Sequence, residues 1–200
     1  SANSSLTYSL TGADAALLTI DALTGEVRLK NAADYESKTS YNFTVTATDS
    51  GNLSSSQAVT VSVFDVNDNT AVIHSGSTGS VAENAATSTV IYTVVATDAD
   101  GTSANNTLSY RLTGADADLL TIDAVTGEVR LKASADYENK ASYNFTVVVT
   151  DNGTGALTDS QAVTVTVNDV NEAPVLSSGV TGNVAENAPT DTVIYTATAT

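Results

Sequence analysis

The stretch Asp65-Val66-Asn67-Asp68-Asn69 carries two carboxylates and two carboxamides around a single apolar side chain. It follows an alternating apolar run, residues 58–63, and precedes a second unit of the same kind. Such a stretch offers oxygen ligands and has little to bury, so it fits the join between two β-domains. We predict that it is a calcium-binding linker. The simpler interpretation is a solvated linker rich in turn-forming residues.

An internal repeat determines the domain organisation. Residues 6–14 return as residues 108–116, an offset of 102, and the offset becomes 104 after a loop that is two residues longer in the second copy. The register of the repeat gives three segments. They are residues 1–69, the later part of one repeat; residues 70–173, a complete repeat; and residues 174–200, the opening strands of a third.

Short runs in which apolar residues alternate with Thr, Ser or Tyr fill each repeat, and Gly, Asn and Asp turns separate them. About seven such strands are expected in the complete repeat, as in a β-sandwich. No helical period of useful length occurs, although residues 114–118 fit one helical turn. The predicted core is Val90, Tyr92, Val94, Leu108, Tyr110, Leu112, Leu120, Ile122, Val129, Leu131, Tyr143, Phe145, Val147, Val163, Val165 and Val167.

The net charge of −16, from 23 acidic and 7 basic residues, limits the classes of partner that the chain can bind. It argues against nucleic acid and against an anionic membrane surface, because both require positive charge. It fits the binding of cations, and the alternative is an acidic surface kept for solubility. The chain has no cysteine, so bound metal is a candidate substitute for disulfides. No run of about 18 apolar residues occurs, so we expect no membrane insertion by this segment.

Catalysis finds no support in the sequence, and we predict that the protein is not an enzyme. There is no cysteine, and the single histidine, His74, has no plausible serine partner and is expected on the surface. Asp14, Asp116 and Asp118 are expected in solvated turns or helix caps. Other carboxylates come in pairs two residues apart, Asp-x-Asp and Asp-x-Glu, on separate loops, and such pairs recur with the repeat. In an extended segment such pairs point the same way, where they can share a hard cation that takes six to eight oxygen ligands.

Five types of motif occur in a fixed order, several of them twice: Val81-Ala82-Glu83-Asn84, Asp98-Ala99-Asp100 with Asn105, Asp136-Tyr137-Glu138, Asp151, and the Asp65–Asn69 stretch. Together they resemble the cadherin repeat, in the form found in very large bacterial surface proteins, and the resemblance covers the whole chain. It implies an all-β fold of tandem seven-stranded Greek-key β-sandwiches with immunoglobulin-like topology. It also implies a cluster of calcium ions (Ca2+) at each join between repeats.

The resemblance implies a ligand set for each of two joins. The upper repeat of the first join would supply Asp34, Glu36, Asp65, Asn67, Asp68 and Asn69, and the lower repeat Asp98, Asp100, Asn105 and Asp151. The second join would use Glu83, Asp136, Glu138, Asp169, Asn171 and Glu172. Glu172 stands where the family has aspartate and Ala173 where it often has asparagine. The lower half of this second site would fall beyond Thr200, so we expect it to be incomplete.

The resemblance favours calcium-stiffened extender repeats of an extracellular cell-adhesion protein, at a bacterial cell surface, with neighbouring repeats of the same chain as partners. Two alternatives remain open. The repeats could themselves mediate adhesion, to another copy of the protein or to a carbohydrate. Copies could also join head to tail, because residues 174–200 carry the opening strands that residues 1–69 lack.

Overall fold

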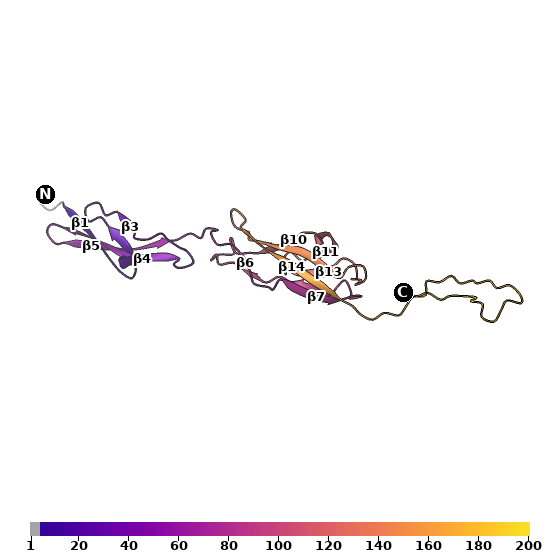
Figure 1. Ribbon diagram of the computed structural model, residues 1–200. Helices are drawn as coiled ribbons and strands as arrows, with labels where there is room; N and C mark the ends of the chain where they lie inside the picture. Colours follow the sequence, from indigo (N-terminus) through magenta and orange to yellow (C-terminus); the bar gives the residue numbers. More distant parts are fainter. Residues whose placement is uncertain (1–4) are drawn as a thin grey trace.

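A computed structural model describes residues 5–200 as two β-sandwiches placed end to end, followed by an extended segment (Figure 1). Residues 1–4, which the sequence assigns to the first repeat, lie outside the described residues. The first sandwich pairs β1, β4 and β5 in one sheet and β2 with β3 in the other. Its elements are β1 (Leu6–Thr11), the 3-10 turn η1 (Ala15–Leu17), β2 (Leu18–Ile20), β3 (Val27–Leu29), β4 (Ser40–Asp49) and β5 (Ser54–Ser62).

The second sandwich contains the complete repeat. One sheet has the order β10-β13-β14-β7, a second has the order β11-β12-β8, and β6 pairs with β9. β14 runs antiparallel to β13 and parallel to β7. The elements are β6 (Val72–Ile73), β7 (Thr78–Ala82), β8 (Val90–Thr93), β9 (Ala96–Thr97), β10 (Ser109–Thr113), η2 (Ala117–Leu119), β11 (Leu120–Ile122), β12 (Glu128–Leu131), β13 (Ser142–Thr150) and β14 (Thr158–Asn168).

The all-β prediction is confirmed. β6 with β7, and β8 with β9, are each one strand interrupted by a bend, so the complete repeat has the seven strands expected of a sandwich. The helical turn predicted at residues 114–118 lies slightly later in the chain, as η2. No helix within residues 5–200 is both long and apolar enough to cross a membrane.

The core follows the predicted alternation with one clear error. Val129, Val147, Val149 and Val165 are completely or almost completely buried between the two sheets. Val90 was predicted in the core but is 37% exposed, whereas Ile91 is 5% exposed. The pairing of β8 with β12 contains a bulge, which shifts the alternation of inward and outward side chains along β8.

Asp14 and Asp116 were predicted in solvated turns or caps, and that prediction is wrong. Both are buried, and neither side chain caps the short 3-10 turn that follows it. Each instead accepts a hydrogen bond from a strand N–H and faces a lysine. Asp118 is exposed, as expected.

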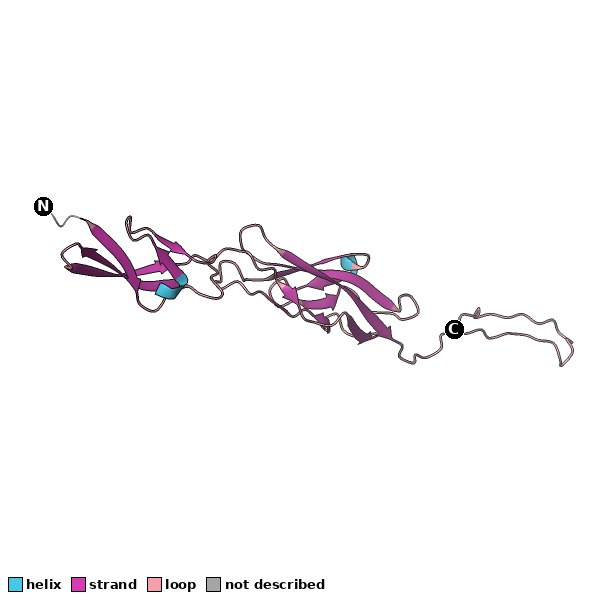
Figure 2. Cartoon of the chain, turned by 60° about the vertical axis from the view of Figure 1, so that its left-hand side comes forward, coloured by secondary structure: helices cyan, strands magenta, loops and turns pink. Residues whose placement is uncertain are grey.

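The opening strands predicted within residues 174–200 do not form. One isolated bridge joins Leu176 to Ala199, which corresponds to the pairing of β6 with β9 in the complete repeat. In that repeat β7 and β8 are held by β14 and β12. Residues 174–200 have no such partner strands among the described residues, and their backbone remains extended (Figures 1 and 2).

Candidate metal site between the two sandwiches

Four segments meet where the sandwiches join (Figure 2). The first sandwich contributes the turn at residues 34–38 and the linker at residues 65–69. The second contributes the loops at residues 98–108 and 151–157, which lie at its near end. All four are irregular backbone, and all carry the acidic or amide side chains predicted from the sequence.

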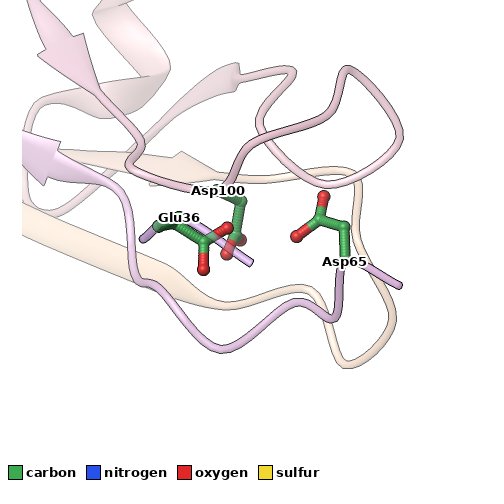
Figure 3. Close-up of side chains that lie close together, drawn as sticks. All are labelled: Glu36, Asp65 and Asp100. Carbon is green, nitrogen blue, oxygen red and sulfur yellow. The ribbon is translucent and has the colours of Figure 1, made fainter. Parts of the chain in front are cut away.

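The centre of the site is a group of carboxylates from both repeats. One oxygen each of Glu36, Asp65 and Asp100 lies within 4.8 Å of the others. Figure 3 shows the three side chains turned toward one another, two of them from the first repeat and Asp100 from the second. Like charges at this separation repel, so a cation between them would stabilise the arrangement.

Five buried oxygen atoms at this join have no hydrogen-bond partner, and they are the only such side-chain atoms found among residues 5–200. Leaving buried acceptors unpaired costs about 1–3 kcal/mol each, so native proteins rarely do so without a ligand. They are all hard oxygen donors, as calcium requires, and no thiolate or imidazole is among them. The atoms are Asp65 Oδ1, Asn67 Oδ1, Asp98 Oδ2, Asp100 Oδ2 and Asp151 Oδ2.

Hydrogen bonds already cross the join. Asn67 Nδ2 donates to Asp151 at 3.2 Å, and Asn69 Nδ2 donates to Asp100 at 2.9 Å. The backbone N–H of Gly101 donates to Glu36 at 3.0 Å. These bonds use one oxygen of each carboxylate and leave the second oxygen of Asp100 and Asp151 free to face a cation.

The two repeats also touch at two glycines. A Cβ on Gly101 would lie 2.4 Å from the ring of Tyr35, and a Cβ on Gly153 would lie 2.2 Å from the side chain of Asn67. No side chain larger than hydrogen fits at either position without displacing its neighbour. The sequence did not predict these contacts, since they depend on how the repeats dock.

Among residues 5–200, no lysine or arginine forms an ion pair with a carboxylate of the site. The four ion pairs of the described residues are Arg28 with Glu26, Lys38 with Asp14, Arg130 with Glu128, and Lys140 with Asp116. None of these carboxylates belongs to the join. The negative charge at the join is therefore left for a cation from solution.

The site shifts carboxyl pKa values in both directions. Burial, and then the charges of Asp100 and Asp151, raise the pKa of Asp98, although a hydrogen bond from the N–H of Asp100 opposes them. Hydrogen bonds from Thr102 and then Asn105 lower the pKa of Asp65 against its own burial. The sequence did not predict the contact between Thr102 and Asp65, because no sequence motif indicates it.

We expect Asp98→Asn to have opposite effects with and without calcium. Because the folded pKa of Asp98 is raised, its charge penalises the folded state above that pKa, and the penalty disappears as the pH falls through it. In EDTA at neutral pH, the variant should melt about 1–3 °C higher. With calcium, the lost ligand should weaken binding about tenfold. Thermal melts in both conditions check this, and a lower melting temperature in EDTA would contradict it.

Two predicted ligands, Asp34 and Asp68, are not part of the central carboxylate group and have local hydrogen-bond partners. Asp34 accepts hydrogen bonds from the N–H and hydroxyl of Ser37, 3.1 and 2.9 Å away, and these bonds lower its pKa. Asp68 is exposed and accepts from Asn69 Nδ2 at 3.1 Å. Both carboxylates are exposed.

The second join gathers a related cluster. One oxygen each of Glu83, Glu138 and Glu172 lies within 4.8 Å of the others. Glu83 is buried and accepts from the N–H groups of Tyr137 and Val170 at 3.0 and 2.6 Å. An open cavity of about 550 Å³ lies beside this cluster, lined by Glu138, Asp169, Val170, Asn171, Glu172, Ala173, Pro174, Val175 and Thr200.

Charge crowding is evident at this second cluster too. A backbone hydrogen bond at Glu138 lowers the pKa of its carboxyl, but burial and the charges of Glu83 and Asp169 raise it more. Asn84 Nδ2 donates to Glu172 at 2.6 Å. Asp136 lies in its own turn and accepts from the N–H of Asn139 at 3.0 Å.

Tandem β-sandwiches with an acidic join define the class of structure, and comparison with known proteins identifies the family. The cadherin domain family matches residues 1–64 and 77–168. The chain belongs to the cadherin family, whose repeats are adhesion and structural modules rather than enzymes.

Individual relatives agree with this assignment. Human Protocadherin Fat 1 is 39% identical over 184 residues, which is 89% of this chain and 4% of that protein. The chain thus spans a small part of the curated relatives that it matches. Among solved structures, human CDH23 EC21–23 has a TM-score of 0.80 at 25% identity, covering 100% of this chain and 69% of that one. The extracellular cadherin domains 3–6 of Protocadherin Gamma B2 give 0.74 at 26% identity, with 86% and 43% covered. Fat 1 and CDH23 are human proteins, so the predicted bacterial origin finds no support in these relatives.

Proposed function

We propose that these repeats are calcium-stiffened extenders of an extracellular cell-adhesion protein. The observation that carries the proposal is the set of five buried, unpartnered oxygens at the first join, contributed by both repeats. A calcium ion would bind these atoms together and so fix one sandwich relative to the next. The likeness to extracellular cadherin domains supports the location outside the cell.

The ligands proposed for the first join fall into an inner and an outer group. Glu36, Asp65, Asn67, Asp98, Asp100 and Asp151 form the inner group, because they converge or hold unpartnered oxygens. The outer group is Asp34, Asp68, Asn69 and Asn105. For the second join we propose Glu83, Asp136, Glu138, Asp169, Asn171 and Glu172.

The mechanical effect follows from charge. Without calcium, carboxylates of both repeats repel across the join, and the hydrogen bonds and glycine contacts that cross it oppose this repulsion. With calcium, the repulsion becomes attraction through shared ligands. Extracellular calcium modules bind with dissociation constants of about 10⁻⁴–10⁻³ M, so extracellular calcium would keep the joins stiff.

Small-angle scattering of the 200-residue chain tests the proposal. In EDTA we expect a broad distribution of distances within the molecule, because the two sandwiches move independently about the join. In millimolar calcium we expect the distribution to narrow and the maximum dimension to increase. Magnesium at the same concentration is the control, since it demands a stricter geometry and retains its waters. If the maximum dimension does not change in calcium, the proposal is wrong.

A second candidate function is association between copies, and a specific feature favours it. The first sandwich has an apolar groove of about 260 Å³, lined by residues that include Leu18, Val27, Tyr41 and Phe43. In the complete repeat the corresponding face is covered by β7 and β8, and residues 174–200 repeat that sequence. Their side chains Val193 and Ile194 are 78% and 60% exposed.

The scattering experiment separates this candidate from the first. Head-to-tail pairing would make the apparent mass rise with protein concentration, in EDTA as well as in calcium. A constant monomer mass would exclude it. Adhesion by the repeats to another copy or to a carbohydrate would show as binding by intact sandwiches, with residues 174–200 uninvolved.

A further inference from the structure

Asp14 is a buried carboxylate that lies outside the metal sites, and it is firmly held. It is 7% exposed. One of its oxygens lies 2.8 Å from Lys38 Nζ, and the other accepts a hydrogen bond from the backbone N–H of Asn42 at 2.6 Å. The hydrogen bond from Lys38 and then that from Asn42 hold the pKa of Asp14 below its usual range. The Asp14 carboxyl is therefore ionised at neutral pH.

Lys38 connects this carboxylate to the metal site. It ends the turn that carries Asp34 and Glu36, and its backbone N–H donates to the carbonyl of Asp34 at 2.9 Å. Its ammonium group lies 5.5 Å from the centre of the ring of Tyr41, which is buried in the core of the first sandwich. One lysine thus ties the turn to Asp14 and to the core.

The second repeat contains the same arrangement. Asp116 is 8% exposed, lies 2.8 Å from Lys140 Nζ, and accepts from the N–H of Asn144 at 2.7 Å. Lys140 Nζ lies 5.5 Å from the ring centre of Tyr143. The backbone N–H of Lys140 donates to the carbonyl of Asp136 at 2.9 Å, in the turn that faces the second join.

The position of the Asp14–Lys38 ion pair, beside the turn that carries Glu36, connects it with the metal site as well as with stability. Glu36 is exposed and lies within 4.8 Å of two like charges, Asp65 and Asp100, which push it away from the join. The turn that carries it has no sheet partner of its own. The Lys38 anchor restricts how far this turn can withdraw, and Asp14 restricts where Lys38 can point.

We propose that Asp14, acting through Lys38, is a positioning residue that holds Glu36 in place for calcium at the first join. Asp116 and Lys140 do the same for Glu138 at the second join. The inference rests on the proposed calcium site. Neither aspartate touches the cation, so each one acts only by keeping its turn in the geometry that binding requires.

Calcium titration of the Asp14→Asn variant tests the inference. Asparagine keeps the shape and can still accept from the N–H of Asn42, but it no longer balances Lys38. NMR signals of the backbone amides of Gly101 and Gly153 report binding at the first join, because both lie in it. We expect the calcium concentration at half-saturation to rise about threefold to fivefold, below the 10–100-fold typical of groups bonded directly to a ligand.

Matched variants separate positioning from general destabilisation. Glu26→Gln also removes one negative charge from the first repeat and breaks an exposed ion pair with Arg28, and it should leave the midpoint unchanged. Lys38→Arg keeps the pair with Asp14 and should bind calcium like the unaltered chain. Lys38→Met should match Asp14→Asn, and combining both should add nothing further, because the two act as one unit.

The outcomes are decisive in each case. If Asp14→Asn and Lys38→Met both fold and bind calcium within twofold of the unaltered chain, the inference is overturned. If Asp14→Asn does not fold, Lys38→Met alone decides, because it leaves Asp14 bonded to Asn42. If the amide signals of the unaltered chain do not move with calcium, the proposed function fails instead.

Discussion

Asp100→Ala abolishes calcium-dependent stiffening at the first join and leaves both sandwiches folded. Asp100 is 3% exposed, lies at the centre of the carboxylate cluster with Glu36 and Asp65, and holds one unpartnered oxygen. Its loss removes a central ligand from the second repeat, so we expect calcium binding at this join to weaken about a hundredfold. Calorimetric titration measures the loss. Scattering should then give the same broad distance distribution in calcium as in EDTA.

The control for this change is Asp118→Ala. Asp118 belongs to the same repeat, is exposed, and lies outside the join, so the substitution removes one negative charge and no ligand. The join of the Asp118→Ala variant should stiffen at the same calcium concentration as that of the unaltered chain. The core of the second sandwich contains neither aspartate, and its melting in EDTA should change little for either variant. An Asp100→Ala chain that still stiffens at the original midpoint would show that Asp100 is no ligand.

The sequence predicted the sandwich well because its signals are local. Alternation of apolar with polar residues marks the strands, and it correctly placed Val129, Val147 and Val165 inside. It failed at Val90, where a bulge against β12 changes the inward face. A bulge is a property of two paired strands, and neither strand shows it alone.

The site was predictable only in its chemistry. Carboxylates and amides in repeated short pairs indicate hard-cation ligands, and the structure brings Glu36, Asp65 and Asp100 together. The sequence could not show that Asp34 turns toward Ser37, because competing backbone and hydroxyl donors decide this locally. Nor could it show that Asp14 is buried, because its lysine partner lies on another loop.

Gly101→Ala should weaken calcium binding at the first join about tenfold, although it changes no ligand. The new Cβ would lie 2.4 Å from the ring of Tyr35 and 3.5 Å from a carboxylate oxygen of Glu36. Overpacking of this kind costs about 1–3 kcal/mol, and each 1.4 kcal/mol corresponds to a factor of ten. The strain acts between the repeats, so it should appear as weaker calcium binding and a changed inter-repeat angle. Calcium titration and scattering measure the two effects.

A second substitution identifies the contact responsible. Tyr35→Ala removes the ring that the new methyl group strikes and leaves the ligands in place, so the double variant should bind calcium more tightly than Gly101→Ala alone. Gly76→Ala is the control, because a Cβ at that position meets nothing within 4 Å. It should bind calcium like the unaltered chain. If Tyr35→Ala gives no rescue, the clash with Tyr35 is not the cause, and the repeats do not dock through this ring. If it does rescue, a glycine–tyrosine contact sets the approach of the two repeats, and calcium tightens a geometry that the chain already defines.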